Sequence, residues 1–225
     1  MDIFLSAFLW IFATLLVVIF ASYLTKKIGE KVLVSFYSIL VVISAITATK
    51  LINIFGLTVP AGVVVYAASF LITDIISEVY GKKSAVTAVW LGLVSMVIFY
   101  GYALITVYWQ PAEYWPHQES YATIIGLSVR ITLAGIIAFI ISQLNDVTVF
   151  HYLKGKHERK KLALRNILST SISQLIDTII FITIAFYGVF DIIPLIIGQY
   201  LIKLIIAFLD TPFVYWGRYI LTEKE

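Results

Sequence analysis

Long apolar runs without a single charge are the feature that most constrains this sequence. Residues 3–24 and 84–108 contain no Asp, Glu, Lys or Arg, and a helix needs about 20 such residues to cross the hydrocarbon core of a bilayer. In lipid, every backbone polar group must be paired within the protein, and the alternating pattern of a membrane β-barrel is missing. The sequence therefore predicts an all-α, polytopic membrane helix bundle that forms a single domain over residues 1–225.

The apolar runs predict about seven membrane spans. These are 3–24, 32–53, 60–80, 84–108, 121–146, 166–187 and 193–217. Lys and Arg gather in every second connection, around 26–31, 82–83 and 154–165, whereas the alternate connections have none. Because cytoplasmic loops are enriched in basic residues, we expect the N-terminus outside and the C-terminus inside a cell membrane that the chain crosses several times.

The sequence lacks the characteristic parts of several function classes. It has no Cys, and its three His residues lie in predicted connections, so no thiolate or histidine metal site is expected. No HExxH or GxSxG motif occurs, which argues against a metallohydrolase or an acyl-transfer enzyme. The placement of the +3 net charge follows membrane topology and does not indicate nucleic-acid binding. We expect no enzyme activity, no cofactor and no bound metal.

Charged side chains remain inside the predicted spans after the loops are accounted for. The cations are Lys50, Arg130 and Lys203, and the carboxylates are Asp74, Glu78, Asp146, Asp177 and Asp210. An uncompensated charge near the bilayer centre costs about 2.5–3.5 kcal/mol on insertion scales. These side chains are therefore expected to pair with one another or to line a wet cavity.

Two simpler interpretations stay open for some of these polar side chains. Glu78 could pair with Lys82, one turn later, at the cytoplasmic surface. Polar groups also join transmembrane helices without binding any ligand, and we expect this role for Ser77, Thr170 and Thr178.

A short sequence repeat accompanies the pattern of spans. SQLND at 142–146 recurs as SQLID at 173–177 on the next span, which runs in the opposite direction. Spans 2–4 and 5–7 would then form two three-helix sets of opposite orientation, as in transporters with a binding site near the bilayer midplane. The sequence is compatible with an inverted repeat of this kind.

Four ordered blocks of sequence resemble a known family. They are TDIISEVYG at 73–81, SQLNDVTVFHYLK at 142–154, LRNILSTSISQLIDTIIFITIAFYG at 164–188 and LIKLIIAFLDTPFVY at 201–215. Together they resemble the queuosine precursor transporter family, also called the vitamin uptake transporter family. The resemblance covers about residues 32–219 and leaves residues 1–31 as an extra N-terminal helix and loop beside a six-helix core.

The resemblance implies a membrane importer of 7-deazaguanine bases, nitrile-bearing or aminomethyl-bearing, that works by alternating access. A carboxylate would accept hydrogen bonds from the N–H groups of a guanine-like edge, a cation or amide would donate to its carbonyl oxygen, and an aromatic ring would stack on the base. The substrate-binding residues expected on this basis are Asp74, Arg130, Gln174, Asp177, Lys203, Gln143, Lys50, Tyr66 and Phe70.

Proton coupling is a further hypothesis. Two carboxylates one helical turn apart in a low-dielectric site repel, so one of them is expected to bind a proton near neutral pH. The candidates are Asp74, Glu78, Asp146 and Asp210.

Two alternatives to a self-sufficient carrier stay open. One is a substrate-capturing subunit that needs an energising ATPase. The other, from a different class, is a seven-helix retinal protein with Lys203 as its Schiff-base lysine. The expected partners are the small-molecule base, the lipid bilayer and, in a homo-oligomer, further copies of the chain.

Overall fold

The computed structural model describes residues 3–48, 50–125, 129–157, 162–188 and 191–223. Within these ranges, the side chains of residues 3–4, 129–132 and 156–157 are not described. The helices are α1 (Ile3–Ile28), α2 (Lys31–Thr47), α3 (Gly62–Val79), α4 (Lys82–Tyr108), α5 (Gln118–Ile125), α6 (Val129–His157), α7 (Leu162–Phe186) and α8 (Ile192–Thr222), and the strands are β1 (Leu51–Ile54) and β2 (Leu57–Pro60).

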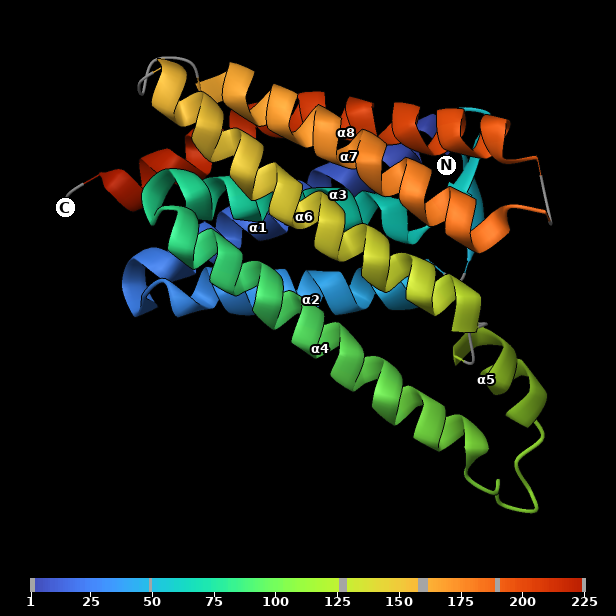
Figure 1. Cartoon of the computed structure of the whole chain (residues 1–225). Coiled ribbons are helices and arrows are strands. Elements are labelled where there is room, and N and C mark those ends of the chain that lie inside the picture. Colours follow the sequence, from blue (N-terminus) through green and yellow to red (C-terminus); the bar gives the residue numbers. More distant parts are fainter. Residues whose placement is uncertain (1–2, 49, 126–128, 158–161, 189–190, 224–225) are drawn as a thin grey trace.

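The long helices form one bundle, with α3 in its interior. Figure 1 shows the long helices lying against one another, with α4 and α6 running obliquely to α2 and α8 and with the far end of α4 projecting beyond the bundle beside α5. Helix α3 packs against α1, α2, α4, α6 and α8, and 15 of its 18 residues are buried. Its residues are mostly apolar, as is typical of a helix in a central position, and its few polar side chains face other helices of the bundle.

Six helices in the described part of the chain are long and apolar enough to cross a membrane. They are α1, α3, α4, α6, α7 and α8, whereas α2 is equally apolar but has only 17 residues. The helix bundle is therefore as predicted. A membrane crossing by α2, which would make seven spans, stays a prediction.

A β-hairpin corrects the prediction that residues 32–53 form one helix, and it adds one small two-stranded sheet to the helix bundle. Helix α2 ends at Thr47, and β1 pairs with β2 in antiparallel register, with Leu51 opposite Pro60. The turn residues Phe55 and Gly56 both have positive φ, 52° and 81°. Two such residues form the tight turn that matches the twist of a hairpin, and glycine favours it. The hydropathy pattern did not reveal this turn, because the residues on both sides of it are apolar.

The predicted span 121–146 also needs correction. Its first residues belong to the short helix α5, and the long helix α6 begins at Val129 and continues to His157. The predicted basic loop 154–165 is therefore shorter than expected. Its first residues belong to the end of α6, and its last residues belong to the start of α7.

The connections alternate between the two ends of the bundle. The α1–α2 and α3–α4 connections, the last turn of α6 and the first turn of α7 lie at the same end as the last turn of α8 (Figure 1), and the sequence is rich in Lys and Arg at these places. The hairpin, the last turn of α7 and the first turn of α8 lie at the opposite end. We call these the basic end and the hairpin end; the cytoplasmic location of the basic end stays a prediction.

Candidate functional site

A cavity of about 300 Å³ lies toward the hairpin end of the bundle. Its wall draws residues from α2, α3, α4, α6, α7 and α8 and from the hairpin strands Leu51–Ile54 and Leu57–Pro60. Gly62 belongs to this wall, and a Cβ there would lie 2.2 Å from the carbonyl oxygen of Ser44. The glycine therefore permits the close approach of α2 and α3 on which the cavity is built.

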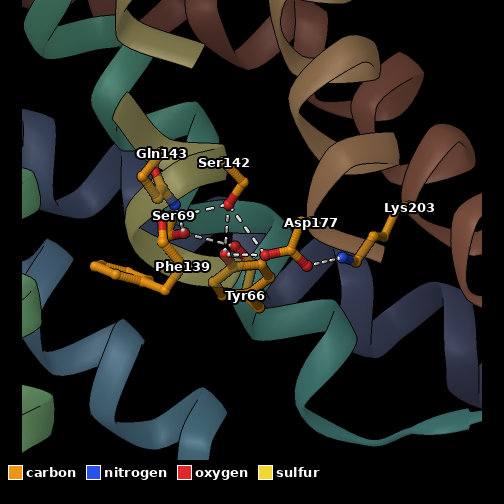
Figure 2. A network of polar contacts seen from close by, with 7 residues as sticks. All are labelled: Tyr66, Ser69, Phe139, Ser142, Gln143, Asp177 and Lys203. Atoms are coloured by element: carbon orange, nitrogen blue, oxygen red, sulfur yellow. Dashed lines mark hydrogen bonds and ion pairs between the residues drawn. The ribbon is translucent and has the colours of Figure 1, made fainter. Parts of the chain in front are cut away.

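A buried ion pair forms the charged part of the cavity wall. The ammonium group of Lys203 donates to Asp177 Oδ2 at 2.5 Å, and these two side chains are only 1% and 6% exposed. Figure 2 shows the second carboxylate oxygen facing two hydroxyl groups: Tyr66 donates to Oδ1 at 2.7 Å and Ser142 donates at 3.0 Å. We call Tyr66, Ser142, Asp177 and Lys203 the cavity group. Its carboxylate already accepts three hydrogen bonds.

The ion pair explains how a lysine is tolerated deep in the bundle. A buried charge is stable only when a partner and further hydrogen bonds compensate for lost hydration. Lys203 also lies 5.2 Å from the centre of the Tyr66 ring, within range of a cation–π interaction. The pairing of Lys203 with Asp177 joins α8 to α7 beside the cavity.

Most of the remaining cavity wall is apolar. Aromatic side chains from α4, α6 and α7 contribute to it, namely Tyr100, Phe139, Phe181 and Phe186. Aliphatic contacts come from residues such as Val41. A small pocket with aromatic walls and a few polar groups suits a flat, partly polar ligand.

Gln199 is a polar member of the wall that was not among the predicted site residues. It lies one helical turn before Lys203, is 5% exposed, and its Oε1 has no hydrogen-bond partner among the described residues. The sequence placed it on the same helix face as Lys203. The sequence alone gave no reason to expect that Gln199 lines a cavity and does not simply pack between helices.

Four other predicted substrate-binding residues are buried but do not belong to the described cavity wall: Asp74, Phe70, Gln143 and Gln174. Phe70 packs edge-on against Tyr66 with ring centres 5.5 Å apart. Gln143 donates to Ser69 Oγ at 2.9 Å (Figure 2). A substrate role for these residues stays a prediction.

The two remaining predicted cations are not placed in the cavity. Lys50 is exposed and lies between the end of α2 and β1, outside any helix, so its predicted position within a span is wrong. Arg130 lies in the first turn of α6, and its side chain is outside the described residues.

Three further carboxylates form a second polar layer, which we call the acidic group: Asp74, Asp146 and Asp210. Each is at most 1% exposed. Thr170 donates to Asp74 at 3.3 Å, Asn166 donates to Asp210 at 3.0 Å, and the three carboxyl groups interact electrostatically. None of the ion pairs found among the described residues involves the acidic group.

Glu78 is the centre of a third cluster, at the basic end. Its carboxylate lies 3.1 Å from Lys154, 2.9 Å from Arg165 and 3.7 Å from Arg218, which belong to α6, α7 and α8. The pairing with Lys82, which the sequence left open, is not among the ion pairs of the described residues. We call these four residues the Glu78 cluster.

Arg165 is the member of the Glu78 cluster that the sequence misassigned. It closes a run of basic residues and was assigned to a solvated loop, yet its side chain is fully buried. It also lies 5.3 Å from the Phe150 ring centre. Leu162, three residues earlier, is buried as well. One apolar residue at helical spacing, next to a basic run, was too weak a signal to predict the burial of Arg165.

Comparison with known proteins identifies the family. The family described as "Putative vitamin uptake transporter" matches residues 60–217, a range that contains the cavity group, the acidic group and every member of the Glu78 cluster except Arg218. This chain belongs to the vitamin uptake transporter family. A curated relative, "Probable queuosine precursor transporter" from Bacillus subtilis (strain 168), is 31% identical over 220 residues, which cover 96% of each chain. No solved structure matches the chain.

Membership defines the general role of the transporter. Its family and its relative are transporters and not enzymes, and its long apolar helices make it a multi-pass protein of the cell membrane. The alignment with the relative leaves only 4% of the 225 residues uncovered, which is about 9 residues. Helix α1 has 26 residues. Most of α1 therefore aligns with the relative as well.

Proposed function

We propose that this transporter imports 7-deazaguanine bases, the precursors of queuosine and archaeosine, and that they bind in the cavity beside Asp177 and Lys203. The name of the curated relative supports the substrate class. The observation that carries the proposal is the cavity itself, in which a buried ion pair meets aromatic walls.

The chemistry of such a base suits the cavity. Ligand pockets usually measure about 300–1,000 Å³, so a cavity of about 300 Å³ is suited to a small bicyclic ring. The faces of the ring would contact the aromatic side chains. The Lys203 ammonium has three N–H groups and gives one to Asp177, so another can donate to the carbonyl oxygen of the base.

Alternating access between the two ends of the bundle is part of the proposal. The cavity lies toward the hairpin end, whereas the Glu78 cluster ties α3, α6, α7 and α8 together at the basic end. Breaking these ion pairs would let the helices separate there, and forming them would close that end. The inverted repeat predicted for spans 2–4 and 5–7 would supply two halves that rock against each other.

Proton coupling is assigned, within this proposal, to the acidic group. Asp74, Asp146 and Asp210 are buried side by side without an ion-pair partner among the described residues. Three negative charges at such a place would be very costly, so protons are the simplest compensation. The carboxylate of Glu78, by contrast, already has three cationic partners, so the coupling role is not assigned to it.

Uptake by the purified chain in proteoliposomes tests the proposal. A labelled 7-deazaguanine base should enter, guanine should compete less well, and collapse of an imposed pH gradient should slow the uptake. Uptake that ignores the gradient would reject proton coupling and leave transport intact. If the purified chain binds the base but does not transport it, it is instead a capturing subunit that needs an ATPase partner.

A further inference from the structure

Gln199 is a polar cavity residue whose side chain has unused hydrogen-bonding capacity. Its amide oxygen is buried and has no hydrogen-bond partner among the described residues. A buried acceptor without a partner is unfavourable because it has lost its bonds to water, so such a group is stabilised when a ligand supplies the missing donor. The residue lies one turn from Lys203, on the same wall of the cavity.

The carboxylate of Asp177, by contrast, has little capacity left. It accepts from Lys203, Tyr66 and Ser142. Two of these bonds occupy Oδ1 and one occupies Oδ2, so at most one acceptor position, beside the Lys203 ammonium, is left for a ligand N–H. Among the buried side-chain acceptors in the described part of the wall, the amide oxygen of Gln199 is the one without any hydrogen-bond partner.

The charge of the cavity is balanced before any ligand enters. Among the described residues of the wall, Asp177 and Lys203 are the charged ones, and they neutralise each other. A ligand that carries an ammonium group would bring a second cation into an apolar enclosure next to Lys203. An unpaired buried charge is strongly unfavourable, whereas an uncharged ring meets no such penalty.

We propose that the cavity selects uncharged planar bases over bases that carry an ammonium group, and that Gln199 is the specificity-determining residue that binds the hydrogen-bond edge of the base. A side-chain amide offers one donor and one acceptor side by side, which match the C=O and N–H of a lactam ring. This inference rests on the proposed function, and among 7-deazaguanines it favours the nitrile-bearing base over the aminomethyl-bearing one.

Competition uptake in proteoliposomes tests the selectivity of the wild type. The nitrile-bearing base should compete at least about tenfold better than the aminomethyl-bearing base. A tenfold difference in affinity corresponds to a free energy much smaller than the penalty for burying an unpaired charge. Equal competition, or a preference for the aminomethyl base, would overturn the inference while the proposed function stands. If neither base is taken up, the proposed function itself fails.

Substitution of Gln199 tests its role separately. Gln199→Glu should shift the ratio between the two bases toward the aminomethyl base by about tenfold or more, because the new carboxylate pairs with the ammonium group. Gln199→Met should weaken competition by both bases to a similar extent, as both lose the amide contact. Gln110→Glu, which adds the same charge in the exposed α4–α5 connection, is the control. A ratio that is unchanged in Gln199→Glu would overturn the assignment of Gln199.

Discussion

At the scale of single residues, the buried charges of this protein differ in how they are compensated. Asp177 is paired with Lys203 and bonded by two hydroxyl groups, and Glu78 is surrounded by cations. In the acidic group, Asp74 accepts from a hydroxyl and Asp210 from an amide, but none of its three members has an ion pair among the described residues. The sequence predicted that these charges would be compensated. It could not predict the partners, because each pair joins two different helices whose packing the sequence pattern does not define.

Removing the charge of Glu78 should destabilise the protein. Glu78→Gln leaves Arg165 as a buried cation without its partner, and loss of one member of a buried pair costs about 3–5 kcal/mol. Thermal unfolding in detergent should show a clearly lower Tm than that of the wild type. Lys82→Gln, which alters the exposed neighbour, should have almost no effect. Equal Tm changes in the two variants would contradict the ion-pair cluster.

At the scale of secondary structure, the long helices could be predicted and the hairpin could not. Apolar runs define α1, α3, α4, α7 and α8 to within about five residues of their ends, because burial in lipid leaves the backbone no alternative to the helix. The segment 51–60 is just as apolar, and hydropathy does not distinguish a helix end from a strand pair. The turn at Phe55 and Gly56, with positive φ at both residues, is the feature that makes this segment a hairpin.

The close contact between α2 and α3 should depend on Gly62. In Gly62→Ala the new Cβ would lie 2.2 Å from the Ser44 carbonyl oxygen and 2.9 Å from the Ala48 nitrogen. Both are backbone atoms, so the helices must move apart, and overpacking of this kind costs about 1–3 kcal/mol. The variant should show a lower Tm and weaker binding of the base.

Gly101→Ala is the matched control for this substitution. It lies in α4, and a Cβ there would meet nothing within 4 Å. A glycine inside a helix is less favourable than alanine by about 0.5–1 kcal/mol, so this variant should be as stable as the wild type or slightly more so. A greater loss in Gly101→Ala than in Gly62→Ala would contradict the packing argument.

At the scale of the whole molecule, the three polar groups follow one another along α3. Tyr66 belongs to the cavity group, Asp74 lies about 12 Å of helix rise further on, and Glu78 about 6 Å beyond that. A path from the hairpin end to the basic end would thus meet the substrate site, the acidic group and the Glu78 cluster in this order. The family resemblance predicted an importer. The order of the three polar groups could not be predicted from the sequence, because it depends on which helices pack together.

The orientation in the membrane can be tested with single cysteines, because the chain has none of its own. Glu113→Cys lies in the α4–α5 connection and Lys83→Cys at the start of α4, and both positions are exposed. With the basic end in the cytoplasm, an impermeant maleimide should label Glu113→Cys on intact cells and Lys83→Cys only after permeabilisation. The reverse pattern would contradict the predicted orientation.

The central claim is that the base binds beside Asp177 and Lys203, separately from the acidic group. Equilibrium binding of a labelled 7-deazaguanine base to purified protein, compared among the wild type, Asp177→Asn and Asp74→Asn, tests it most directly. We predict that Asp177→Asn loses most of the binding, because Lys203 is left without its partner, and that Asp74→Asn binds nearly as well as the wild type. Loss of binding in Asp74→Asn together with normal binding in Asp177→Asn would contradict the account.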